Sequence, residues 1–130
     1  MDERRCLAAG AIAMFFAVGA GAFGAHALKA MLAPDLLAVW HTAVQYHAWH
    51  ALGLLAVGLS MAIDASNRRQ RALRAAAWLF AIGIVLFSGS LYLLALSGQR
   101  WLGAVTPLGG VAFLAGWLAL AWAALRPTRN

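Results

Sequence analysis

Long apolar stretches alternate with short polar breaks along the whole chain. The apolar stretches run at about residues 6–27, 40–63, 75–96 and 107–125. Each is about 19–24 residues long, enough to cross a hydrocarbon core about 30 Å thick at the helical rise of about 1.5 Å per residue. Backbone groups inside a bilayer must be paired within the protein, so these stretches are predicted to be helices. The pattern predicts an all-α fold, a four-helix transmembrane bundle forming one integral membrane domain over residues 1–130.

The composition of the chain excludes several other classes of protein. The chain is 64% hydrophobic and only 11% charged, with a mean hydropathy of +0.78. A soluble domain is about a quarter charged. So few charges cannot cover a water-facing surface, which excludes a soluble enzyme and a disordered tail. The single cysteine, Cys6, cannot form an internal disulfide, which excludes a disulfide-rich secreted module.

The net charge of +6 carries information about topology. The basic residues lie in the polar breaks and at the ends of the chain, without the basic face that nucleic-acid binding requires, so we expect no nucleic-acid partner. Lys29 and Arg100 fall on one side of the membrane. The remaining basic residues fall on the other: Arg4, Arg5, Arg68, Arg69, Arg71, Arg74, Arg126 and Arg129. The positive-inside rule therefore predicts a multi-pass membrane protein with both termini and the middle loop in the cytoplasm.

Two features of the first stretch need an interpretation. Ala25-His26-Ala27 resembles a signal-peptide cleavage site, but the apolar run before it exceeds the 7–15 residues typical of a signal peptide, so we expect a retained span. Small residues also recur every four positions. They are Ala9, Ala13, Ala17, Gly21 and Ala25. Such a stripe predicts close packing against another helix, from the same chain or from a neighbouring protomer. Four tryptophans are predicted to be interfacial anchors, Trp78 and Trp122 near the inner edge of the membrane and Trp40 and Trp101 near the outer edge.

The noteworthy polar residues fall in the half of the membrane that faces the periplasm. The candidate site residues are His26, Tyr46, His47, His50, Ser88, Ser90, Tyr92 and Thr106. We expect a polar cluster that opens toward the periplasmic face, with His50 roughly 10 Å inside the apolar core. On a helical wheel the polar side chains of the second stretch cover about 240° of arc, so one narrow pocket cannot hold them all. Paired carboxylates, a phosphate loop and a Ser/His/Asp arrangement are lacking, so no catalytic residue is assigned.

The polar cluster has three interpretations. His47 and His50 are three residues apart and can share a helix face, and with His26 they would supply a three-histidine metal or haem site. Alternatively, His26, His50 and Tyr92 line a pocket that handles a proton or a ligand. The third interpretation is interhelical hydrogen bonding that fixes the bundle. The sequence does not choose between them, and the cofactor stays undetermined.

Several motifs together resemble a known family. They are Gly21-Ala-Phe-Gly-Ala-His26, the segment from Trp40 through Tyr46 to His50, Phe87-Ser-Gly-Ser-Leu-Tyr92, and Thr106-Pro-Leu-Gly-Gly110 followed by Phe113 and Gly116-Trp117. They resemble the YgdD/YwdK-type family of small bacterial membrane proteins over nearly the whole chain. The resemblance implies a four-helix inner-membrane protein of unknown activity. His26 and His50 match histidines of the family, whereas relatives often have Gln at position 47, which weakens the three-histidine metal site.

Three classes of function follow. The first is a structural or accessory membrane component, whose partners are the lipid bilayer and a second copy of the chain or a larger membrane complex. The second is a component that transports a small molecule, an ion or a proton and acts as an oligomer. The third is a histidine-ligated metal or haem protein. We favour the first class, which requires no enzyme activity.

Overall fold

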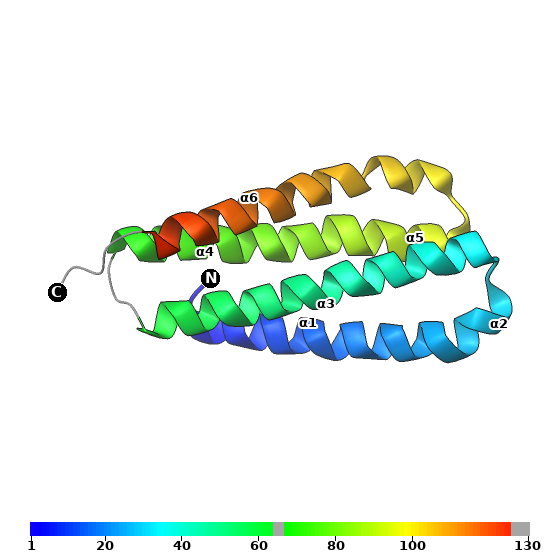
Figure 1. Cartoon of the computed structure of the whole chain (residues 1–130), viewed down its shortest axis with the longest axis horizontal. Coiled ribbons are helices and arrows are strands. Elements are labelled where there is room, and N and C mark those ends of the chain that lie inside the picture. The colour runs from blue at the N-terminus through cyan, green and yellow to red at the C-terminus, as the bar shows by residue number, and fades with distance from the viewer. Residues whose placement is uncertain (64–66, 126–130) are drawn as a thin grey trace.

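The computed structural model describes residues 1–63 and 67–125, which form four long helical rods (Figure 1). The first rod consists of α1 (Glu3–Phe23), a π-helical turn η1 (Gly24–Leu28) and α2 (Lys29–Met31). The second is α3 (Pro34–Ile63). The third joins α4 (Asn67–Gly83), a second π-helical segment η2 (Ile84–Gly89) and α5 (Ser90–Ser97). The fourth joins a short 3₁₀ helix η3 (Arg100–Ala104) and α6 (Thr106–Ala124). All four rods are long and apolar enough to cross a membrane, which confirms the all-α four-helix prediction.

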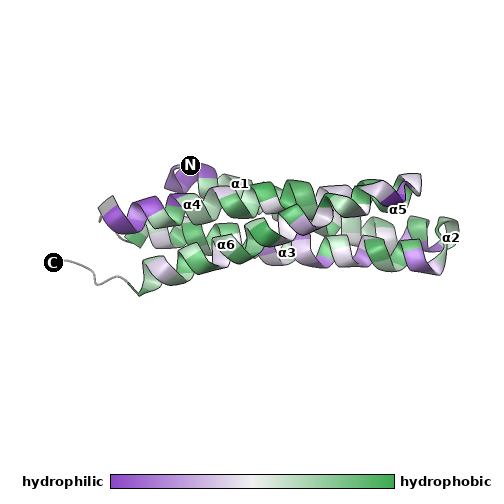
Figure 2. Cartoon of the chain, turned by 90° about the horizontal axis from the view of Figure 1, so that it is seen from above, coloured by the Kyte–Doolittle hydropathy of each residue, from purple (hydrophilic) through white to green (hydrophobic). Residues whose placement is uncertain are grey.

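The rods pack as two pairs. Helix α1 packs mainly against α3, and α4 packs mainly against α6, while α3 also contacts α4, η2 and α5. Figure 1 shows that α3 and α6 end, and α4 begins, at the end of the bundle that holds the N-terminus. Helix α2 and the connection between α5 and α6 lie at the other end. In Figure 2 hydrophilic residues lie at the start of α1 and of α4, others lie at the opposite end near α5 and along α3, and most of the bundle between its two ends is apolar. This distribution is the one that a bilayer requires.

Two clusters of buried side chains form the core. The larger cluster lies toward the end that holds the N-terminus and joins α1, α3, α4 and α6. Its buried members are Cys6, Leu54, Val57, Met61, Leu73, Ala76, Ala77, Phe80, Phe113 and Ala123. The smaller cluster, toward α2, consists of Leu28, Trp40 and Ala95. Because the first cluster is apolar throughout, that half of the bundle is held together by side-chain packing.

Helix α1 approaches α3 closely, along a line that differs from the predicted stripe. The buried residues of the first rod are Cys6, Gly10, Ala17, Gly24 and Leu28. A Cβ added at Gly10 would lie 2.9 Å from the Leu55 side chain of α3, so only glycine fits there. Of the predicted stripe, Ala17 is buried but Ala25 is exposed. The partner of this face is therefore a helix of the same chain, and the small residues shape an internal contact.

Helix α3 begins earlier than the second apolar stretch suggested. It starts at Pro34, and its 30 residues make it about 45 Å long. Proline fits the first helical position because its missing N–H would have no partner there. His47 and His50 consequently lie near the middle of the helix rather than in its first turns, at a depth where a polar side chain needs a partner within the protein or from a ligand.

Candidate functional site

A hydrogen bond between His47 and Tyr92 joins the second and third rods. Nδ1 of His47 lies 3.1 Å from the phenolic oxygen of Tyr92. The His47 side chain is only 8% exposed, and its ring meets that of Tyr92 edge to face at 6.0 Å between centroids. We find no hydrogen bond to the second ring nitrogen of His47 within residues 1–63 and 67–125. The pair therefore retains hydrogen-bonding capacity that the described protein does not use.

Trp40 closes the site on the side nearer α2. Its indole N–H donates a 2.9 Å hydrogen bond to the carbonyl of Ala20 in α1, and its ring lies 4.6 Å from that of Tyr92. The absence of a side chain at Gly24 lets the indole approach α1, since a Cβ there would lie 2.6 Å from a ring carbon of Trp40. Trp40 is 6% exposed, so the predicted role as an interfacial anchor is wrong for this residue. Trp101, by contrast, is exposed.

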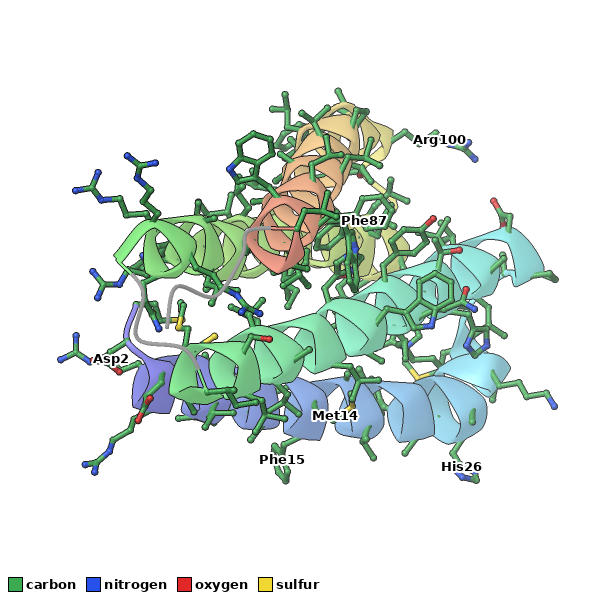
Figure 3. All side chains as sticks on the ribbon, turned by 60° about the vertical axis from the view of Figure 1, so that its left-hand side comes forward. Asp2, Met14, Phe15, His26, Phe87 and Arg100 are labelled. Atoms are coloured by element: carbon green, nitrogen blue, oxygen red, sulfur yellow. The ribbon has the colours of Figure 1, made fainter. Side chains whose placement is uncertain are left out.

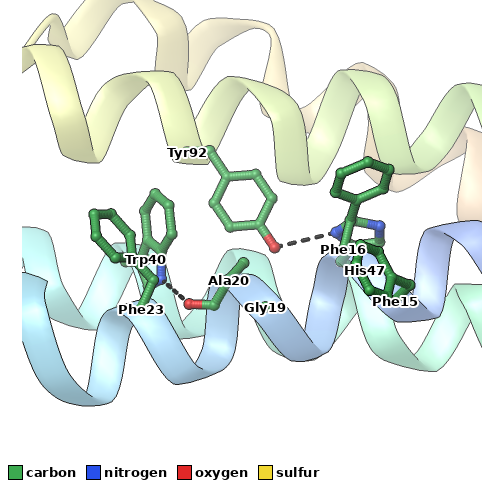
Figure 4. A pocket seen from close by; sticks show the side chains of 8 residues that line it. All are labelled: Phe15, Phe16, Gly19, Ala20, Phe23, Trp40, His47 and Tyr92. Carbon is green, nitrogen blue, oxygen red and sulfur yellow. Dashed lines mark hydrogen bonds between the residues drawn. The ribbon is translucent and has the colours of Figure 1, made fainter.

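These side chains form the base of a groove of about 440 Å³ between α1, α3 and α5 (Figure 4). The lining residues are Phe15, Phe16, Gly19, Ala20, Phe23, Trp40, His47 and Tyr92. Figure 4 shows Tyr92 reaching from the third rod toward His47, with Trp40 and Phe23 at the opposite end. Phe15 and Phe16, on the outer surface of α1, are 74% and 59% exposed. The groove thus opens sideways, toward the region that lipid occupies in a membrane.

His50 has a different environment from His47, although it lies one helical turn away. Its Nδ1 lies 2.7 Å from the carbonyl oxygen of Tyr46, and its Nε2 lies 3.1 Å from the indole nitrogen of Trp117 in α6. The indole N–H can only donate, so Nε2 is the acceptor and Nδ1 carries the proton. The ring is also stacked on Phe113 at 3.4 Å between centroids. With both nitrogens paired, His50 is a neutral structural residue that ties α3 to α6.

The predicted hydroxyl residues lie along the third and fourth rods, and Tyr46 of α3 contacts the third rod. The hydroxyl groups of Ser90 and Thr106 are 2.8 Å apart and connect α5 to α6, and Ser90 also lies 2.9 Å from the carbonyl oxygen of Phe87. Ser88 is fully buried in η2, and its hydroxyl lacks a hydrogen-bond partner among the described residues. Tyr46 stacks on Phe87 at 4.4 Å between centroids. These contacts agree with the interpretation that hydrogen bonds and ring contacts fix the bundle.

The structure does not assemble the predicted eight-residue cluster as one site. His47 and Tyr92 meet in the groove, His50 faces α6, Tyr46 stacks on Phe87 of η2, and His26 is exposed on the outer face of the first rod (Figure 3). The proposed pocket of His26, His50 and Tyr92 is therefore not formed. Across residues 1–63 and 67–125, no three His, Cys, Asp or Glu side chains are placed to hold a metal ion. The reason is geometric, because neighbouring histidines of α3 point at different helices.

Most of the groove lining could not be predicted from the sequence. Because the helix is apolar on all sides, the sequence does not distinguish Phe15, Phe16 and Phe23 from ordinary lipid-facing residues. It does not distinguish Gly19 from the many other glycines of the chain either. Trp117, the partner of His50, lies in one of the motifs that carried the family resemblance, but no pattern in the sequence connects it to position 50. The one signal in the sequence is the spacing of Phe15, Phe16 and Phe23, which places these aromatic side chains close together on one side of the helix.

Comparison with known proteins agrees with the resemblance. A family model described as protein of unknown function (DUF423) matches residues 20–110. YwdK of Bacillus subtilis, named a UPF0382 membrane protein, is 50% identical over 117 residues, which cover 90% of this chain and 93% of YwdK. YgdD of Escherichia coli K12, named a UPF0382 inner membrane protein, is 40% identical over 136 residues, covering 100% of this chain and 96% of YgdD. A UPF0382 membrane protein of Staphylococcus epidermidis is 47% identical over 117 residues, covering 90% of this chain and 92% of that protein. No solved structure matches the chain.

Proposed function

Because this chain belongs to the DUF423 family of membrane proteins of unknown function, we propose that it is an accessory component of the cytoplasmic membrane that binds a lipid-soluble small molecule in the groove between α1, α3 and α5. One observation carries the proposal. His47 is 8% exposed in an almost wholly apolar groove, and its second ring nitrogen has no hydrogen-bond partner in the described protein. An unpaired polar group in apolar surroundings costs roughly 1–3 kcal/mol, which a ligand that pairs with it recovers.

The shape of the groove supports entry of the ligand from the bilayer. The groove is open on the outer surface of α1, where Phe15 and Phe16 are exposed. In a membrane, those side chains contact acyl chains, so a molecule dissolved in the lipid can reach His47 without crossing the headgroup region. A water-soluble molecule has no comparable route along this apolar surface.

The packing of the bundle argues against a transport pathway through a single chain. Leu54 and Phe80 are at most 1% exposed and belong, with Phe113, to the larger cluster. That cluster, which contains no charged side chain, fills the half of the bundle toward the N-terminus. A hydrated pathway from the groove would have to pass through it, and this makes a binding protein the better-supported function.

The orientation in the membrane is part of the proposal. We place the end that carries the N-terminus, Arg68 and Arg71 in the cytoplasm, following the positive-inside rule. Lys29 and Arg100 then lie on the periplasmic side. Arg100 approaches Asp35 at 3.8 Å between charged groups there. Both partners are largely exposed, so this ion pair contributes little to stability.

Native mass spectrometry of the intact protein, released from mild detergent after expression in a bacterial membrane, tests the proposed function. The wild type is expected to retain a lipid-soluble adduct that Gly19→Leu loses, because Gly19 lines the groove and has open space around its Cβ position. Ala11→Leu, an exposed position on the same helix that does not line the groove, is the matched control and should retain the adduct. Identical adducts on all three proteins would identify them as boundary lipid and overturn the proposal.

A further inference from the structure

We propose that the groove ligand is an uncharged lipid-soluble compound with a carbonyl oxygen on a flat conjugated ring, the chemistry of a quinone. This inference rests on the proposed function and adds the class of ligand. It is carried by the hydrogen-bonding capacity of the His47–Tyr92 pair, by the depth of that pair in the membrane and by the aromatic walls around it.

The hydrogen-bonding capacity of the pair favours a ligand that accepts. A neutral imidazole has one N–H donor and one acceptor nitrogen, and a phenol can both donate and accept. If Tyr92 donates to Nδ1 of His47, the N–H on Nε2 stays free, and if Nδ1 donates, the O–H of Tyr92 stays free. The pair therefore always retains one donor. A carbonyl oxygen pairs with that donor in both arrangements. A hydroxyl group can pair with it too, but its own O–H finds a free nitrogen acceptor only in the second arrangement, where Nε2 of His47 carries no proton.

The depth of His47 excludes the carbonyl groups of ordinary phospholipids. Helix α3 is about 45 Å long, and His47 lies about 20 Å from its first residue. Centring α3 in a hydrocarbon core about 30 Å thick puts His47 near the midplane of the bilayer. Phospholipid ester groups lie at the edges of that core. The carbonyl must then belong to an uncharged molecule that carries its polar group into the membrane interior.

The walls of the groove suit a flat ring. Trp40 is held by its bond to the Ala20 carbonyl, and it lies between Phe23 and Tyr92 at 6.1 Å and 4.6 Å between ring centroids. Phe15 and Phe16 stand at the opposite end, near His47 (Figure 4). Aromatic side chains pack favourably against a conjugated ring through stacked and edge-to-face contacts. The volume of about 440 Å³ falls in the range of about 300–1,000 Å³ typical of small-molecule pockets, and a hydrocarbon tail would extend into the lipid.

The test uses the full-length protein in lipid nanodiscs and three probes of known chemistry. The probes are a fully substituted decyl-benzoquinone, the corresponding decylbenzene without carbonyl groups, and the isoprenoid alcohol farnesol. Apparent affinity is obtained from the rise of Tm with the mole fraction of each probe in the lipid, since a ligand that binds only the folded state raises Tm. The quinone is expected to bind the wild type roughly threefold to tenfold tighter than either other probe, which is the contribution of one hydrogen bond.

Variants and a vibrational measurement locate the contact. Either single substitution, His47→Phe or Tyr92→Phe, leaves one donor, so the decisive variant is the double substitution, which should reduce quinone affinity to that of decylbenzene. His41→Phe, at an exposed position of α3 that does not line the groove, should bind the quinone like the wild type. The infrared C=O band of the bound quinone is expected at lower wavenumber than in protein-free lipid. The probe comparison and this band need only the wild type, so a double variant that fails to fold does not remove the test.

The outcomes separate the two proposals. If quinone and decylbenzene bind the wild type equally, the groove takes lipid-soluble molecules but the carbonyl inference is wrong. The same conclusion follows if farnesol matches the quinone or if the C=O band does not move. If none of the probes raises Tm and the mass spectrum shows no groove-dependent adduct, the proposed function itself fails.

Discussion

The indole N–H of Trp117 donates a 3.1 Å hydrogen bond to Nε2 of His50, and this bond fixes the protonation of a histidine in the middle of a membrane helix. The other ring nitrogen reaches the carbonyl of Tyr46 at 2.7 Å. His47, one turn earlier, has a partner for only one of its nitrogens in the described protein. The two histidines thus differ in role, with His50 stabilising the bundle and His47 available to a ligand.

Replacing His50 is expected to destabilise the bundle strongly. His50→Ala removes the buried imidazole and its stacking on Phe113, and it leaves the Trp117 N–H without its partner in a partly buried contact, at a cost of about 2–4 kcal/mol. His41→Ala, at an exposed position of the same helix, should change the free energy of unfolding by less than about 0.5 kcal/mol. Thermal melts of both variants in detergent measure the difference, and equal midpoints would contradict the structural role of His50.

Adding a methyl group at Gly109 is expected to push α6 away from the third rod. A Cβ there would overlap the backbone nitrogen of Phe87, and backbone cannot move aside as a flexible side chain can. We expect Gly109→Ala to cost about 1–3 kcal/mol. Gly19→Ala is the control, because a Cβ at Gly19 has no atom within 4 Å and alanine favours the helix. The prediction is wrong if the two variants melt at the same temperature.

The hydroxyl groups of Ser90 and Thr106 are expected to couple energetically. Their 2.8 Å contact joins α5 to the start of α6. A double-mutant cycle with Ser90→Ala and Thr106→Val should give a coupling energy of about 0.5–1.5 kcal/mol, measured from unfolding in detergent. Ser97→Ala in place of Ser90→Ala provides a reference cycle, since the Ser97 hydroxyl donates to the Leu93 carbonyl and accepts from the backbone N–H of Gln99, both nearby in the sequence and neither on α6. A coupling as small as that of the reference cycle would show that the contact contributes nothing.

Fusions to alkaline phosphatase test the orientation, because the enzyme is active only after export to the periplasm. A fusion after Gly98, between α5 and η3, is expected to be highly active. Fusions at Arg71, and at the C-terminus, should be inactive, since the positive-inside rule places them in the cytoplasm. The reversed pattern of activities would invert the proposed topology without affecting the groove.

The sequence predicts the spans well because long apolar runs have few alternatives in a bilayer. The wide arc of polar residues on the second stretch also indicates that one pocket cannot hold them all. In the structure, His47 contacts α5 and His50 contacts α6. The groove was not predictable, because it depends on the approach of α1 to Trp40 at Gly24. The hydropathy pattern predicts that Trp40 lies at the membrane edge. It contains no information about which helix packs over Trp40.

The two π-helical segments, η1 and η2, determine the directions in which side chains before and after them point around the helix axis. A π turn holds more residues than an α turn, so side chains beyond it point in directions that an uninterrupted α-helix would not give. Leu28, at the end of η1, is 1% exposed in the smaller core cluster. Losing one residue from Gly24–Leu28 would rotate the preceding and following parts of the rod by about 100° relative to each other. The length of this short turn therefore governs whether α1 and Leu28 can both face α3 at once.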